Sequence, residues 1–331
     1  MPIPIILGVI VGGAALYGAV KGVKGAIDHS DATDINQDAH SMVNVANRKV
    51  DEQREITNAA LKDYGERKLR AFNGVIADFI DTFGRLKNVD TIHTPELDKL
   101  NLGDFSTVSL DRSRSDYELL KSSGLGLGAG MGGGAALAFG AYNGTMLLAT
   151  ASTGTAISTL SGAAATNATL AWLGGGSLAA GGGGMALGSM VLGGIVAGPA
   201  LAIFGHIVGN KGEEALNSAR SNLEQAKTIR DEAKLMVGKL DAIEKLSTFA
   251  NNTFSTTSTH LRHAVYDLKK IIDVEGENYQ AFSSESRETV FRSVKFAQLI
   301  KAMIDTPILD QDGNLVLTTE KRLQEIKGSL A

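Results

Sequence analysis

Residues 215–243 read ALNSARSNLEQAKTIRDEAKLMVGKLDAI, and this stretch decides the fold class. Small and apolar residues recur in it at spacings of seven, four and three, the pattern of a coiled-coil seam. Alanine at half of the seam positions predicts a helix that packs closely on a neighbour. The sequence therefore predicts an all-α protein with long coiled-coil-like helical arms. The residues expected to pack in this arm are Ala219, Ala226, Ile229, Ala233, Met236 and Leu240.

A second arm is predicted upstream, after a polar joint at residues 29–38. Residues 39–88 contain no proline, and Phe72, Ile76 and Phe79 begin a further apolar stripe at helical spacing. We expect residues 39–88 and 213–250 to pack as an antiparallel pair, because the segment between them returns the chain to its start.

Between the arms lies a charge-free run, residues 122–210, without one Asp, Glu, Lys or Arg but with 24 glycines and 19 alanines. Soluble domains carry about a quarter charged residues. Small residues let helix backbones approach closely in lipid. The run therefore predicts a Gly/Ala-rich membrane hairpin region, whose number of passes stays open. Its one histidine, His206, is either interfacial or functional. The predicted packing residues are Gly181, Gly184, Gly193 and Gly194.

The N-terminus is a further apolar element. Residues 1–20 carry no charged side chain, and lysines follow this stretch rather than precede it, the reverse of a signal peptide. Residues 3–20 are long enough to span a bilayer, and a buried core helix is the alternative. Small residues four apart on one face predict a packing ladder at Ala14, Gly18 and Gly22.

Near the C-terminus, Asp312-Gly313 between two apolar stretches predicts a small β-hairpin. The expected domain organisation is an N-terminal apolar helix (1–28), a first helical arm and connector (29–121), the Gly/Ala-rich region (122–210), a second helical arm (211–282), and a C-terminal helix, hairpin and closing helix (283–331).

Residues suited to catalysis or ligand binding are scarce. There is no cysteine, and the net charge of -4 gives no reason to expect nucleic acid. His260 and His263 have no third metal ligand near them in sequence, and the glycine blocks lack the spacing of nucleotide-binding motifs. The sequence therefore predicts no enzyme, no cofactor and no metal site.

The stretch ATASTGTAISTLSGAAATNATLAWLGGGSLAAGGGGMALG (149–188) resembles a block of uncharacterised bacterial glycine-zipper membrane proteins. That resemblance implies a membrane protein but assigns no catalytic residue. The layout, helices around a Gly/Ala-rich hairpin, is also loosely similar to that of apolipoprotein L and of α-helical pore-forming proteins.

Two functions follow as expectations. The first is a membrane-inserting oligomeric protein, a pore-forming or membrane-disrupting effector in bacterial defence or toxicity that also has a soluble state before insertion. The alternative is a constitutive membrane scaffold whose coiled arms recruit cytoplasmic partners. Lysines and arginines flank the apolar elements on the arm side, which predicts a bacterial inner-membrane location with cytoplasmic arms. The expected partners are the lipid bilayer, further copies of the chain and a protein bound by the arms.

Overall fold

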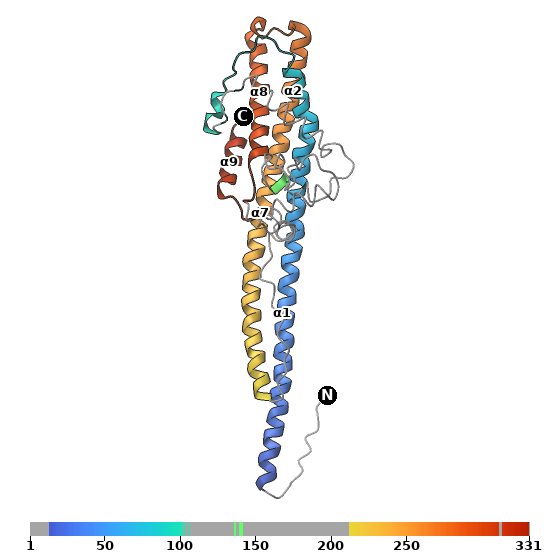
Figure 1. Cartoon of the computed structure of the whole chain (residues 1–331), viewed down its shortest axis with the longest axis vertical. Helices are drawn as coiled ribbons and strands as arrows, with labels where there is room; N and C mark the ends of the chain where they lie inside the picture. The colour runs from blue at the N-terminus through green and yellow to red at the C-terminus, as the bar shows by residue number, and fades with distance from the viewer. Residues whose placement is uncertain are drawn as a thin grey trace, which may run out of the picture. The chain divides into compact units, whose positions relative to one another are not determined.

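The computed structural model describes residues 13–100, 102, 105, 136, 139–141, 212–310 and 313–330, except for the side chains of residues 13–29, 96, 99 and 212–215. Its described part is mostly helical and contains no strand, which confirms the all-α fold class. The elements are α1 (Gly13–Ala71), the π-helix η1 (Phe72–Ile76), α2 (Ala77–Phe83), the 3-10 helix η2 (Pro95–Leu100), α7 (Gly212–Glu275), the 3-10 helix η6 (Tyr279–Ala281), α8 (Ser284–Asp305) and α9 (Leu317–Gly328) (Figure 1).

Helix α1 is uninterrupted through the polar joint that the sequence suggested at residues 29–38. The chain forms two compact units, and the two longest helices contribute to both. Unit 1 comprises Met1–Glu52 with Gly198–Val237, and unit 2 comprises Gln53–Ala197 with Gly238–Ala331.

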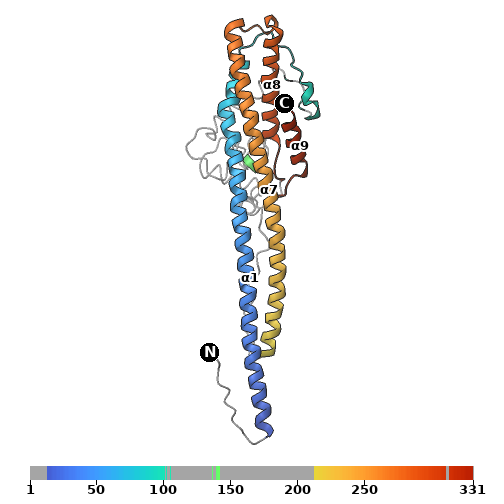
Figure 2. The ribbon, with the colours of Figure 1, turned by 180° about the vertical axis from the view of Figure 1, so that it is seen from behind.

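Unit 1 is a parallel pair formed by α1 and α7, whose blue and yellow parts run side by side in Figures 1 and 2. Ala32 packs on Ala219 in one layer, and Ala39 packs on Ala226 in the next. These alanines are at most 3% exposed, so the two backbones lie close together. Between the layers, the Asn222 amide donates a hydrogen bond to the Asn36 side chain over 2.9 Å. A polar pair in such a seam fixes the register at a cost in stability.

In unit 2, α1 and α7 again run parallel. Side-chain hydrogen bonds join residues 183 to 190 positions apart, from Thr57 with the Leu240 carbonyl to Asn88 with Asn278. The two helices are parallel because the sequence separation between the bonded residues stays nearly constant along both of them. Past the end of α2, Lys87 and Asn278 form a parallel bridge.

Helix α8 runs back along the pair. Glu275, at the end of α7, accepts a hydrogen bond from Ser286 in the first turn of α8, while Thr257 meets Met303 near the other end of α8. Gly276 ends α7 with a φ of 82°, a left-handed conformation that favours glycine. One apolar core joins these helices to α9 and η2.

The expected antiparallel arrangement of the arms is therefore wrong. A short loop would force neighbouring helices to be antiparallel. Here residues 84–211 lie between the end of α2 and the start of α7, and Ala219 in the second turn of α7 packs on Ala32 of α1. A connection of that length can return the chain far enough for the second helix to run in the same direction as the first.

The expected C-terminal β-hairpin is not supported. Leu309 and Leu315 form one isolated antiparallel bridge, and the described residues around them contain no strand. Two backbone hydrogen bonds flank this bridge, from the Asp310 N–H to the Asn314 carbonyl and from the Val316 N–H to the Ile308 carbonyl, but the Ile308 N–H, which a longer ladder would use, donates to the carbonyl of Ala141. Helix α9 then begins at Leu317, which leaves no room for a longer ladder.

The expectations of transmembrane helices, of a pore and of an inner-membrane location are corrected as well. Across the described ranges, no helix combines the length and the apolarity that crossing a membrane requires. Moreover, the described residues of the charge-free run lie in protein rather than on a lipid-facing surface: Ala136, Phe139 and Ala141 are at most 1% exposed within unit 2. Most of the run lies outside the described residues.

Candidate functional site

One face of α1 in unit 2 carries the most unusual side-chain environment of the described chain. Leu61, Tyr64, Gly65 and Lys68 follow one another at spacings of three, one and three, which places them on the same side of a helix. This face meets the described residues of the charge-free run between positions 136 and 141, which are Ala136, Phe139, Gly140 and Ala141. We call these four residues the docked segment, and their contact with α1 the dock.

Glycine on both sides makes the dock a contact between backbones. A Cβ atom built on Gly65 would lie 1.8 Å from the Ala136 carbonyl oxygen, and one built on Gly140 would lie 1.8 Å from the Leu61 carbonyl oxygen. Atoms cannot approach so closely, and a main-chain carbonyl cannot rotate away as a flexible side chain can. Each position therefore requires glycine, because it alone has no Cβ.

Lys68 is fully buried beside this contact. Its Nζ donates a hydrogen bond to the Phe139 carbonyl over 3.2 Å and lies 4.3 Å from the centre of the Tyr64 ring. Burial lowers the pKa of the Lys68 amine to about 7, although the charge of Asp305 acts in the opposite direction. An amine enclosed in apolar surroundings favours its neutral form because the charged form loses its hydration.

Tyr64 ties the same turn of α1 to α8. Its hydroxyl donates to the Met303 carbonyl over 3.2 Å, and its ring meets Phe254 of α7 edge-on at 6.0 Å. Burial raises the pKa of this hydroxyl well above its usual range, so Tyr64 stays protonated and keeps donating. The α1 wall of the dock is thus fixed to both other long helices of unit 2.

The docked segment is held from two further directions. The Ala141 carbonyl accepts hydrogen bonds from the N–H groups of Ile308 and Leu309, over 2.8 and 2.9 Å. The Phe139 ring packs with Leu69 and meets the Phe72 ring edge-on at 6.2 Å. Phe72 opens the π-helix η1, an irregularity that is often found at functional sites.

The Lys68 amine in the dock can respond to protons but is closed to solvent. A lysine with a pKa near neutrality could act as a nucleophile or a base. However, Lys68 is 0% exposed, and its amine contacts the Phe139 carbonyl and the Tyr64 ring rather than an open cleft. The groups enclosed here are those of the chain itself.

The remaining candidate ligands are dispersed. Within the described part of the chain, no three His, Cys, Asp or Glu residues gather as a metal site would need. His260 stacks on the Phe296 ring with 5.0 Å between ring centres. Asp310 serves its turn, where its side chain accepts from the Asn314 N–H.

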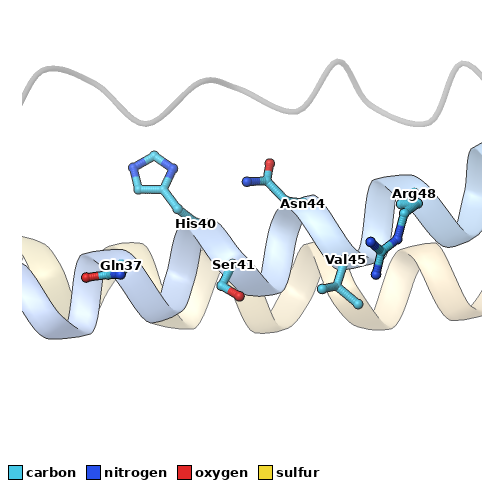
Figure 3. Close-up of a pocket in the computed structure, with 6 residues that line it drawn as sticks. All are labelled: Gln37, His40, Ser41, Asn44, Val45 and Arg48. Carbon is cyan, nitrogen blue, oxygen red and sulfur yellow. The ribbon is translucent and has the colours of Figure 1, made fainter.

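A polar stripe on α1 is the second surface of interest, and it belongs to unit 1. It lines a shallow hollow of about 330 Å³ (Figure 3). At 100° per residue, the stripe lies opposite the alanine seam. Most of its side chains can donate or accept hydrogen bonds, and Val45 is 40% exposed. Its members are Gln37, His40, Ser41, Asn44, Val45 and Arg48.

The structure places the expected arm residues along the inner side of α7. Ala219 and Ala226 are fully buried in unit 1, and Leu240 is 1% exposed in unit 2. Ile229, Ala233 and Met236 are half-buried. Other expected site residues cannot be assessed. Ala14, Gly18 and Gly22 belong to α1, where the backbone alone is described. Gly181, Gly184, Gly193, Gly194 and His206 lie outside the described residues.

The sequence analysis did not predict the dock, although the α1 side of this contact carries two signals in the sequence. Gly65 lies within a long helix, where glycine costs about 1 kcal/mol relative to alanine. Lys68 falls on the apolar face defined by Leu61 and Phe72. A helix-weakening residue and a charge on a face otherwise suited to the core are both reasons to look for a specific contact.

Comparison with family models, with curated proteins and with solved structures finds no match to this chain. The resemblance of residues 149–188 to glycine-zipper proteins therefore stays a prediction, and the function has to be argued from the two surfaces described above.

Proposed function

We propose that this chain is a non-catalytic helical scaffold that holds part of its own Gly/Ala-rich run against the helical bundle of unit 2. The observation that carries the proposal is the crossing of Gly65 and Gly140, where each residue leaves room for the backbone of the other segment. Two glycines placed so that each accommodates the other indicate a specific contact rather than an incidental one.

The chemistry of the run supplies the reason for such a scaffold. A long segment without charged side chains would expose apolar surface, and large exposed apolar patches promote association. In unit 2, the Phe139 ring is buried. The Lys68 amine donates a hydrogen bond to the Phe139 carbonyl, and the N–H groups of Ile308 and Leu309 donate to the Ala141 carbonyl. Storage of the segment thus removes apolar atoms from water without leaving these carbonyls unpaired.

The storage proposal can be tested by disulfide trapping, since the chain has no cysteine of its own. Leu69 and Phe139 share one buried cluster, so the double variant Leu69→Cys, Phe139→Cys should form a disulfide rapidly under mild oxidation. Ile56→Cys with Phe139→Cys is the matched control, because Ile56 is 53% exposed on the same helix. Equal trapping of both pairs, or of neither, would contradict storage at this site.

A second function is favoured by the polar stripe of unit 1: recruitment of a protein partner by the arm. The alanine seam buries small side chains on one face, and on the opposite face of α1 the side chains of Gln37, Asn44 and Val45 are exposed. This agrees with the expected role of the arms as recruiting elements.

A photocrosslinking amino acid placed in the stripe tests recruitment. At Asn44 it should give a discrete crosslinked product in cells that contain the natural partners. At Gln225, an exposed position of α7 in the same unit, it should not. Recruitment through this face is contradicted if Asn44 yields no product, or the same product as Gln225.

A further inference from the structure

The dock places the ionisable Lys68 amine against the stored segment. This combination supports an inference that goes beyond the proposed storage function and depends on it. We propose that the dock is a proton-controlled latch: it holds the docked segment on α1 while the Lys68 amine is neutral and loosens when that amine is protonated.

The geometry supports the latch because the protonated amine needs more hydrogen-bond acceptors than the closed dock provides. A protonated lysine has three N–H donors, while the described surroundings offer the Phe139 carbonyl and the face of the Tyr64 ring. Hydration of the charged amine would require the removal of a covering group. Tyr64 is bonded to α8 and packed on α7, which leaves the docked segment as the part to be displaced.

The charged and titratable groups around Lys68 define the direction of the effect. From α8, the Asp305 carboxylate favours the charged amine, but it is also bonded to Lys301 over 2.7 Å. From α1, Tyr64 remains neutral because burial raises its pKa. From α7, the neighbour packed at this level is Phe254, and the described residues of the segment itself are not ionisable. Burial, which lowers the pKa of Lys68, therefore outweighs the charge of Asp305, which raises it.

The sign of the pH dependence follows from the two states of the lysine. In the closed dock the pKa of Lys68 is about 7, whereas a hydrated lysine titrates near pH 10.4. Between these values the open state binds more protons, so each unit of acidification should favour opening about tenfold. Below about pH 7 the amine is protonated in both states, and the dependence should level off. The same linkage makes unit 2 more stable as the pH rises from 7 towards 10.

The experiment uses the full chain with 4-fluorophenylalanine at Phe139, whose ring contacts Phe72 when the dock is closed. Fluorine NMR then reports closed and open populations. From pH 9 to pH 7 the closed-to-open ratio should fall about a hundredfold. In Lys68→Met, which keeps a long side chain without the charge, the ratio should not change with pH.

Asp305→Asn provides an independent variant, because it leaves Lys68 in place. Loss of this carboxylate should lower the pKa of Lys68 further, so that opening continues to increase below pH 7. A closed dock at every pH in the wild-type chain, or an identical pH response in Lys68→Met, would overturn the latch while leaving storage intact. A dock that is open at every pH would overturn storage itself.

Discussion

Replacement of Gly65 by alanine should open the dock and lower the free energy of unfolding of unit 2 by about 1–3 kcal/mol, the usual cost of overpacking. The added Cβ would lie 1.8 Å from the Ala136 carbonyl oxygen and 2.7 Å from the Gly140 nitrogen, so a backbone has to move. Alanine favours a helix over glycine by about 1 kcal/mol. A net loss would therefore show that the clash exceeds the gain in helix propensity.

Gly238→Ala is the matched control for this change. Gly238 lies in α7 within unit 2, and a Cβ built on it meets no atom within 4 Å. The substitution should raise the free energy of unfolding by up to about 1 kcal/mol. Urea unfolding followed by circular dichroism measures both variants. If both variants are stabilised, the docked segment does not pack on α1.

Ala226→Glu should unfold the helical pair of unit 1, at a cost of about 3–5 kcal/mol for an uncompensated buried charge. Ala226 is fully buried in one cluster with α1 residues Ala39 and Val43, so a carboxylate placed there would lose its hydration among apolar side chains. Thermal melting should show an early loss of helical signal. Gln225→Glu adds the same charge at the exposed neighbouring position and should melt like the wild-type chain. Unchanged melting of both variants would contradict the seam.

The helical nature of the arms could be predicted from the sequence because their seam is local information. The positions of Ala219, Ala226 and Leu240 follow from spacing alone, and all three are buried in the structure. The direction of pairing could not be predicted in that way. It depends on how residues 84–211 return the chain, and a seam of alanines fits parallel and antiparallel partners alike.

The dock, too, could be predicted only in part from the sequence. Gly65 and Lys68 could have been singled out as odd residues on one face of a helix, but their partner could not. Gly140 is one of 24 glycines in the charge-free run, and nothing in its immediate sequence distinguishes it. The contact depends on tertiary packing between segments far apart in the chain.

The membrane prediction failed for a related reason. Glycine and alanine allow close backbone approach wherever a partner lies, whether the surroundings are lipid or protein. In the described part of the run, the partner is helix α1, and Ala136 and Phe139 are buried against this protein surface. Composition alone does not separate the two environments.

The central claim is that the docked segment lies on the bundle of unit 2, and amide hydrogen exchange tests it most directly. The N–H groups of Ile308 and Leu309 both donate to the Ala141 carbonyl. We predict strong protection of these two amides in the wild-type chain, and its loss in Gly65→Ala while the amides of α8 around Met303 stay protected. Fast exchange of both amides in the wild-type chain, or equal protection in the two proteins, would contradict the dock.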